Sequence, residues 1–336
     1  MRRFLILVLL ISGFKTFAQQ LPQYTQYTFN ELLVNPAVTG IESYWDIKSG
    51  YRSQWSGLEG APKTKYLSFS IPLGRAFTLN DYGQMNSNSD NPMGAEAAHS
   101  YEASQSHSGI GLSVISDKTG QISQNHFDAN YAYHIRMSGQ FNLAVGASLG
   151  FNNISLNTSQ VTLANSTDPA IGQGNNSQWK PEAAIGIWGY ASGFFIGASV
   201  QQLLPASISF NKDSVSSGNG KTYAQYFLTA GFRGYLSDDI TVLPSVMVRP
   251  AALGPVTFDV NMKFAFRDNF WIGGAYRRND AIAGSFGFNL GGFLTLGYSY
   301  DYTTSALNTV SGGTHEIMVG LLLNNNYNVT SPRHTW

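Results

Sequence analysis

Much of this chain alternates apolar and polar residues with the two-residue period of a β-strand. In the clearest segment, 255–267, one face is apolar and the other is polar or charged. The apolar face carries Val256, Phe258, Val260, Met262, Phe264 and Phe266, and the polar face carries Thr257, Asp259, Asn261, Lys263, Ala265 and Arg267. About ten residues at about 3.3 Å each, tilted by about 40°, climb about 25 Å, which is the height of the apolar band of an outer-membrane barrel.

Similar segments recur along most of the chain, and together they predict about fourteen strands. These strands centre on 45–55, 64–71, 110–114, 127–135, 141–151, 183–187, 194–200, 226–232, 240–248, 255–267, 270–276, 282–288, 294–302 and 317–323. A bacterial single-chain barrel needs an even number of antiparallel strands. We therefore predict an all-β fold, a transmembrane antiparallel β-barrel of about fourteen strands.

The connections between the predicted strands agree with a barrel that has short turns on one rim and long loops on the other. Short connections near 136–140, 190–193, 236–239, 267–269 and 290–292 alternate with longer ones at 152–180, 202–222 and 303–314. The exceptions are a short connection at 279–280 and a long polar stretch at 74–106. By this alternation 74–106 falls on the periplasmic rim, where a long insertion suggests a surface for a periplasmic partner.

Composition favours a strand surface covered by lipid. Charged residues make up 12% of the chain, about half the usual share of a soluble domain, and aromatic residues make up 13%. The alternative is a soluble all-β sandwich, but its strands are usually five or six residues long and its charge content is higher.

A formal net charge of zero gives no electrostatic case for nucleic acid. The lack of cysteine excludes disulfides and thiolate sites.

Both ends of the chain are predicted to lie outside the barrel. Residues 1–18 have the charged start, the short apolar core and the small final residue of a secretory signal peptide. That apolar run is too short for a single spanning helix, which is the alternative. Residues 19–44 lack clean alternation, so we expect an N-terminal periplasmic or plug segment. The barrel is predicted over 45–324, and 325–336 are predicted to form a polar C-terminal tail.

Charges on the polar face of the predicted strands would point into the barrel lumen. They are Asp46, Lys48, Arg52, Asp128, Arg136, Glu182, Arg233, Arg249, Asp259, Lys263 and Arg267. These charges could form a docking surface or path for a polypeptide. They could equally form a lattice of ion pairs that fills the barrel, which is the commoner arrangement because an unpaired charge in a low-dielectric interior is costly.

No sequence motif points to catalysis, a cofactor or a metal. The six histidines include no pair at helical metal-binding spacing, and His315-Glu316 lacks the second histidine of a zinc-protease motif. The glycines lack the following helix that a phosphate loop needs, and no serine lies in a nucleophile elbow. We therefore predict that the protein is not an enzyme and has no cofactor, metal or catalytic residues.

Three stretches of the chain resemble the PorP/SprF family. They are PQYTQYTFNELLVNPAVTG at 22–40, YRSQWSGLEGAPKTKYLSFSIPL at 51–73 and YSYDYTTSALNTVSGGTHEIMVG at 298–320. The matching positions we single out are Asn35, Pro36, Gly40, Arg52, Gln54, Trp55, Gly60, Ala61, Pro62, Lys63, His315 and Glu316. We expect those in the first two stretches to shape the N-terminal segment and the first hairpin. A polar insert at 84–106 is longer than the family pattern leads us to expect.

The resemblance implies an outer-membrane protein of a Gram-negative bacterium that is associated with the type IX secretion system. It implies an accessory role in protein secretion and gliding motility, namely export or cell-surface anchoring of a cognate large surface protein, gliding adhesins included. The implied partners are that secreted protein with its type IX C-terminal domain, components of the translocon or periplasmic ring, and outer-membrane lipid. The alternative function is that of an outer-membrane porin or solute transporter, which needs an open lumen.

Overall fold

The computed structural model describes residues 25, 27–74, 101–157, 176–208, 220–250, 256–267 and 269–325. The signal peptide expected at 1–18 lies outside the described residues. So do residues 84–100 of the expected polar insert and the tail from 326 onward. Among the described residues, no helix has the length and apolar content needed to cross a membrane.

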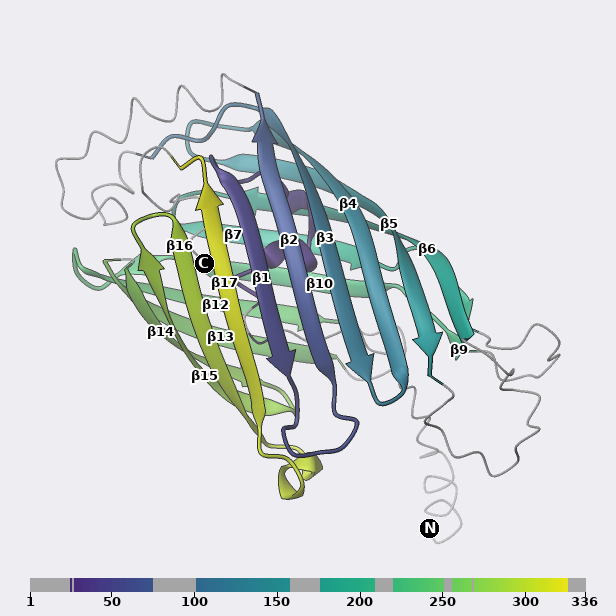
Figure 1. The fold of residues 1–336 in the computed structure, drawn as a ribbon. Helices are drawn as coiled ribbons and strands as arrows, with labels where there is room; N and C mark the ends of the chain where they lie inside the picture. The colour runs from purple at the N-terminus through teal and green to yellow at the C-terminus, as the bar shows by residue number, and fades with distance from the viewer. Residues whose placement is uncertain are drawn as a thin grey trace, which may run out of the picture.

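Fourteen strands of the described residues form one antiparallel ring (Figure 1). They are β1 (Trp45–Ser53), β2 (Lys63–Leu73), β3 (His107–Thr119), β4 (Ile122–Arg136), β5 (Asn142–Leu156), β6 (Asn176–Tyr190), β7 (Phe194–Gln201), β10 (Gln225–Phe232), β12 (Ile240–Arg249), β13 (Thr257–Phe266), β14 (Phe270–Arg277), β15 (Ala281–Leu290), β16 (Leu294–Thr303) and β17 (Thr314–Leu323). Each strand pairs with the next along the chain, and β1 pairs with β17, so the ring closes. The predicted all-β barrel of fourteen strands is confirmed.

The structure also contains shorter strands and helices. Three two-residue strands are described, and of these only β11 joins the main sheet, where it pairs with β12. The three are β8 (Ser207–Ile208), β9 (Gly220–Lys221) and β11 (Gly234–Tyr235). Three short 3-10 helices are also described, namely η1 (Glu31–Leu33), η2 (Pro36–Val38) and η4 (Ala306–Thr309).

The barrel wall is polar on its inner face and apolar on its outer face, the reverse of a soluble protein. On β5, Leu149 and Phe151 are 69% and 57% exposed, whereas the neighbouring Ser148 and Asn152 are 6% and 4% exposed. A soluble domain would bury the leucine and phenylalanine. Lipid tails cover such a surface without penalty, so the alternation that predicted the strands is explained by a membrane outside and a polar lumen inside.

The two rims of the barrel differ in their connections. The rim where β1 begins and β17 ends, called here the turn rim, has short connections at 137–141, 191–193, 233–239, 267–269 and 291–293. The opposite rim, called here the loop rim, carries 54–62, 157–175, 202–224, 250–256 and 304–313 as well as two tight turns at 120–121 and 278–280. The long connection 74–106 joins the end of β2 to the start of β3, so it lies on the turn rim, as the sequence predicted.

Strands β4, β5 and β6 are longer than the sequence pattern predicted. Each has 15 residues, so the connection expected at 152–180 shrinks to 157–175. The extra residues of β5 and β6 are mostly polar and do not alternate regularly, and they include the cross-strand hydrogen bond from Asn153 Nδ2 to Ser177 Oγ at 2.7 Å. The hydrogen-bonded pairing of β5 and β6 therefore extends beyond the apolar band. In that region the sequence lacks the alternation from which strands were predicted.

Residues 27–44 lie inside the barrel rather than beside it. Figure 1 shows η1 and η2 as purple coils within the ring of strands. Most of this segment is buried, and Ala37 and Thr39 are 0% exposed. We call residues 27–44 the plug. The core of this protein is therefore the filled lumen, where plug and inward-facing side chains meet.

Candidate functional site

The plug packs against the wall in two apolar clusters. One cluster joins Ala37, Val38 and Ile41 of the plug to Trp188 and Phe195 of the wall. The second joins Tyr27, Leu33 and Val34 to wall residues that include Tyr66 and Met247. Buried apolar contacts on several sides of the lumen hold the plug as part of the fold.

Hydrogen bonds join the plug to strands on different sides of the lumen, β2 to β12. Asn30 Nδ2 donates to Ser68 Oγ of β2 at 2.9 Å, and the backbone nitrogen of Gly40 donates to Ser70 Oγ at 2.6 Å. On the opposite wall Gln201 Nε2 of β7 donates to the carbonyl of Leu33 at 2.9 Å. The irregular backbone of the plug is thus satisfied by side chains of the wall, as burial requires.

Asn35, one of the family-motif positions, links the plug to two neighbouring strands. Its Oδ1 accepts a hydrogen bond from Ala37 N at 3.0 Å, which caps η2. Its Nδ2 donates to the carbonyls of Ile187 on β6 at 3.0 Å and Ala198 on β7 at 3.3 Å. Pro36 follows it as the first residue of η2. The asparagine therefore sets both the start of the helix and its position against the wall.

Glycines let the plug backbone lie directly on the barrel wall. A Cβ on Gly146 of β5 would overlap the backbone of Ala37, and one on Gly186 of β6 would overlap Asn35. Gly40 has φ +74° and faces Gly109 of β3 in the same way. Only glycine allows such close approach between two backbones.

Two stacked histidines hold the end of the plug that follows η2. The rings of His107 on β3 and His134 on β4 are parallel, with centroids 4.4 Å apart. His134 Nε2 donates to the carbonyl of Thr39 at 2.9 Å, and His107 Nε2 donates to that of Gly40 at 3.0 Å. Tyr190 Oη lies 3.0 Å from His134 Nδ1. Sequence reasoning assigned neither histidine a partner, because each contact joins segments far apart in the chain.

A charged network fills the lumen near the loop rim. Arg52 of β1 pairs with Asp301 of β16 at 2.8 Å and with Glu316 of β17 at 2.9 Å, and all three side chains are nearly inaccessible to solvent. Thr25 joins them, since its backbone nitrogen donates to Glu316 Oε2 at 3.1 Å and its hydroxyl donates to Asp301. Tyr66 Oη donates to the other oxygen of Glu316 at 3.3 Å.

The network continues along the wall through a second arginine. Arg277 of β14 pairs with Asp280 at 2.9 Å, with Asp259 at 3.4 Å and with Asp301 at 3.7 Å. Arg249 Nη2 reaches both oxygens of Asp259 at 3.0 Å. Opposite charges alternate along this chain of contacts, which offsets the cost of burying them. Arg277 and Asp301 were not among the predicted lumen charges, although both lie on the polar face of an alternating strand.

Most of the charges expected in the lumen lie on its wall. Asp46, Lys48, Arg52, Asp128, Glu182, Arg249, Asp259 and Lys263 occupy inward positions of the strands. Arg233 is buried just beyond the end of β10. Arg136 and Arg267 differ, because each lies where its strand ends at the turn rim and is exposed there. Arg136 pairs with Glu102 at 3.3 Å, and Arg267 pairs with Asp239 at 2.6 Å.

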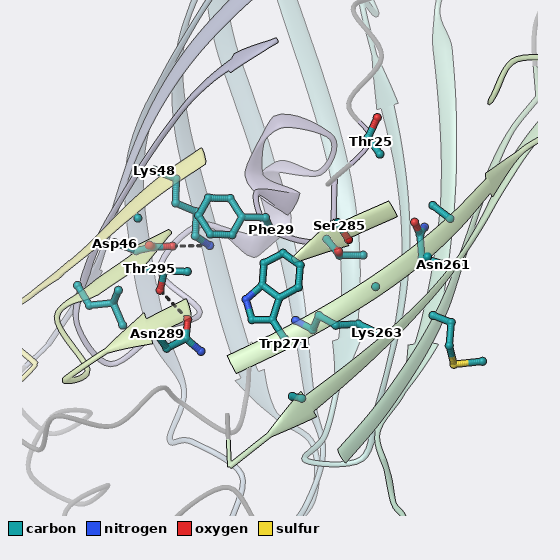
Figure 2. Close-up of a pocket in the computed structure, with 18 of the residues that line it drawn as sticks. Thr25, Phe29, Asp46, Lys48, Asn261, Lys263, Trp271, Ser285, Asn289 and Thr295 are labelled. Atoms are coloured by element: carbon teal, nitrogen blue, oxygen red, sulfur yellow. Dashed lines mark hydrogen bonds and ion pairs between the residues drawn. The ribbon is translucent and has the colours of Figure 1, made fainter. Parts of the chain in front are cut away.

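A cavity of about 100 Å³ lies beside the plug in the half of the barrel near the turn rim (Figure 2). Lys48 Nζ lies 2.9 Å from Asp46 and 5.5 Å from the ring centroid of Phe29, a plug residue. Lys263 Nζ lies 5.5 Å from the ring centroid of Trp271. This space is large enough for a few water molecules and too small for an ordinary ligand.

The motif residues after β1 build the first hairpin on the loop rim. Gln54 N donates to the carbonyl of Pro62 at 2.9 Å, which closes the loop, and Ala61 N donates to that of Leu58 at 3.3 Å. Trp55 has φ +45°, so the chain turns sharply directly after β1. These contacts are backbone contacts, and the residues shape the loop.

The remaining motif positions divide between the loop rim and the two faces of β17. Gly60 has φ +73° and accepts a hydrogen bond from Gly120 N at 2.8 Å, and Lys63 begins β2 with an exposed side chain. On β17, Glu316 points into the lumen, whereas His315 is half-buried on the outer face. His315 Nδ1 lies 2.7 Å from Tyr298 Oη, as expected for aromatic groups at a membrane interface.

Residues 101–106 pack against the wall at the turn rim. The carbonyl of Ser104 accepts a hydrogen bond from Asn142 Nδ2 at 2.9 Å, and Ala103 N donates to the carbonyl of Gly139 at 2.7 Å. Tyr101 is buried, which raises the pKa of its hydroxyl above the ordinary value. The described end of the long connection between β2 and β3 is therefore ordered against the rim.

No group of three or more metal-ligating side chains occurs among the residues that the structure describes.

The family of this chain follows from comparison with known proteins. A family model described as "Type IX secretion system membrane protein PorP/SprF" matches residues 16–321. The chain belongs to this family. As a PorP/SprF protein it is a barrel of the outer membrane associated with type IX secretion. Because outer-membrane barrels have short periplasmic turns, we assign the turn rim to the periplasm and the loop rim to the cell exterior.

Solved structures resemble the PorP/SprF barrel only distantly. The toluene transporter TbuX of Ralstonia pickettii is 10% identical, with 88% of this chain and 92% of that chain covered and a TM-score of 0.46. The CymD monoaromatic hydrocarbon channel is 9% identical over 89% and 93%, with a TM-score of 0.49. Omp33 of Acinetobacter baumannii is 6% identical over 85% and 100%, with a TM-score of 0.47. No curated protein matches the sequence.

Proposed function

We propose that this PorP/SprF barrel serves the export or cell-surface anchoring of one cognate large surface protein, such as a gliding adhesin. Membership of a type IX secretion family supports this role. The observation that carries the proposal is the buried plug, which fills the lumen and forms hydrogen bonds with wall strands that include β2, β7 and β12. A barrel filled in this way acts as an anchor or docking platform for other proteins.

The filled lumen argues against the alternative function of a porin or solute transporter. Such a protein needs a continuous aqueous path, whereas the described cavity beside the plug amounts to about 100 Å³. Several lumen charges that could have lined a path, among them Arg52, Arg277 and Asp259, form ion pairs with other lumen charges. They support the lattice interpretation over a polypeptide path.

The cognate partner is proposed to carry a type IX C-terminal domain, and further contacts are proposed with components of the translocon or periplasmic ring. The turn rim offers a surface for the latter. Residues 101–106 are held against it, and Arg136 and Glu102 are exposed there. An ordered polar surface at the periplasmic end suits a protein partner.

Deletion of the gene tests the proposed function directly. We expect the deletion strain to lose one large surface protein, measured by surface proteomics, while other type IX substrates are still secreted. Plasmid-borne wild-type protein restores the missing substrate. Equal loss of all substrates, or loss of none, would contradict the proposal.

Planar-bilayer recording separates the proposed role from a channel. The purified protein should show almost no conductance, because the plug fills the lumen. As a positive control, deletion of residues 25–44 should give stable open-channel steps if the barrel still folds, which heat-modifiable migration on gels verifies. Steady conductance by the wild-type protein would favour the transporter alternative.

A further inference from the structure

The outer face of β2 changes from apolar to basic near the loop rim. On β2 the outward side chains Leu67 and Leu73 are 49% and 39% exposed and belong to the apolar band. The next outward positions toward the loop rim are Lys65 and Lys63, and both are exposed. Two residues along a strand advance about 6.6 Å, so Lys65 lies one step beyond the apolar band.

A third lysine completes this group on the neighbouring strand. Lys118 of β3 is exposed on the same outer face and is the direct register partner of Lys63. Lys65 is paired with Ser116 on β3 and with Tyr51 on β1, and Tyr51 is 40% exposed on the outer face. We call Lys63, Lys65 and Lys118 the lysine patch.

The lysine patch lacks acidic partners in the described structure. Among the described residues no ion pair or hydrogen bond joins any of its ammonium groups to a carboxylate. Asp117, adjacent in sequence to Lys118, is on the inner face and accepts a hydrogen bond from Thr64. Like charges directly opposite in a β-ladder destabilise it unless a counter-charge is present. Three such groups close together therefore favour the binding of an anion.

Exposed arginines at the turn rim differ from the patch in this respect. Arg136 and Arg267 each have a carboxylate of the chain within ion-pair distance. The lysine patch, by contrast, has no carboxylate partner among the described residues and lies on the outer face near the loop rim, which we assigned to the cell exterior. Lysine side chains reach headgroup phosphates from such positions by extending along the apolar surface.

We propose that the lysine patch is a binding site for the phosphate groups of a phosphorylated lipid in the outer leaflet of the outer membrane. The lysines supply point charges to phosphate oxygens, Tyr51 packs at the interface, and Leu67 contacts the acyl chains. The site would bind one class of lipid to one sector of the barrel, β1 to β3. The proposed lipid site depends only on the barrel and on its orientation in the membrane. It does not depend on the identity of the secreted protein.

Binding of lipid A to the purified protein in detergent tests this site. The probes are bis-phosphorylated lipid A and the same lipid A with both phosphates removed, and native mass spectrometry measures the bound fraction. We expect the phosphorylated form to bind preferentially. In the variant Lys63→Gln/Lys65→Gln/Lys118→Gln we expect a roughly 100-fold weaker affinity, since each lysine near an anionic lipid contributes roughly fivefold.

Two further variants keep the test decisive. Lys63→Arg/Lys65→Arg/Lys118→Arg preserves the charge and should retain binding. Arg278→Gln removes an outward-facing charge that lies near the ring of Phe258 in another sector of the barrel, and it should leave binding unchanged. Heat-modifiable migration on gels verifies that each variant is folded. The proposal is overturned if both forms of lipid A bind equally, if the triple glutamine variant binds as the wild type does, or if Arg278→Gln weakens binding as much.

Discussion

Arg52 and Glu316 pair at 2.9 Å directly across the seam where the first and last strands of the barrel meet. They are register partners in the β1–β17 ladder, and both side chains are almost fully buried. The same guanidinium holds Asp301, and Thr25, at the start of the described chain, bonds to all three. One arginine therefore ties together the closure of the barrel and the anchoring of the N-terminal segment.

Replacing Arg52 should destabilise the barrel strongly. Arg52→Leu leaves Glu316 and Asp301 buried with one cation fewer, and loss of one member of a buried ion pair typically costs about 3–5 kcal/mol. The free energy of unfolding in lipid vesicles, from urea titration followed by tryptophan fluorescence, measures the change. Adding Glu316→Leu should recover part of the loss, because the unpaired carboxylate is then gone.

Arg136→Leu is the matched control for this variant. Its ion pair with Glu102 is exposed at the turn rim, and such pairs contribute about 0–1 kcal/mol. If Arg52→Leu were as mild as Arg136→Leu, the buried network would not stabilise the closed barrel.

The inner and outer faces of β13 should respond differently to a new charge. Val260 is 45% exposed on the outer face, whereas Asn261 lines the cavity beside the plug. Val260→Arg should cost about 2–4 kcal/mol if it lies near the bilayer midplane, and Asn261→Arg should cost far less. The comparison uses the same unfolding titration in vesicles. Equal effects at the two positions would contradict the assignment of inner and outer faces.

Adding a methyl group to Gly146 should push the plug away from the wall. Gly146→Ala places a Cβ on the backbone of Ala37, and overpacking of this kind costs about 1–3 kcal/mol. We expect lower stability together with greater protease accessibility of the plug, measured by limited proteolysis and mass spectrometry. Gly284→Ala is the control, since a Cβ at Gly284 on the outer face of β15 meets nothing within 4 Å. An intact, protease-resistant plug in Gly146→Ala would show that the two backbones are not in close contact.

Asn35 offers a test of how the plug is attached. Asn35→Ala removes the cap of η2 and leaves the carbonyls of Ile187 and Ala198 without this donor, so we expect a loss of about 2 kcal/mol. Asn35→Asp should cost more, because a carboxylate would face those two carbonyls in a buried place. Chemical denaturation of the folded barrel provides the measurement.

The control for Asn35 is Asn308→Ala on the exposed η4, which should change stability by no more than about 0.5 kcal/mol. If Asn35→Asp were better tolerated than Asn35→Ala, the side-chain amide would not donate to the wall in the way described.

The strands, their number and their two faces were predictable from residue order alone. Segments such as 255–267 carry the contrast between lipid and lumen in a two-residue period, and this contrast acts on each strand separately. The prediction failed at the ends of β5 and β6, where Asn153 and Ser177 extend the ladder above the membrane. In these extensions most residues are polar and apolar residues follow no regular two-residue period, so the sequence signal disappears while the backbone pairing continues.

The contacts inside the lumen were decided by the tertiary structure. The period places Arg52 and Glu316 on inner faces, but only barrel closure brings these residues, 264 positions apart, into one ion pair. Likewise, nothing near His107, His134 or Gly146 in the sequence indicates that a plug backbone lies against them. A strand pattern reports the environment on each of its sides, whereas the identity of the neighbour depends on how the ring closes and where the plug enters.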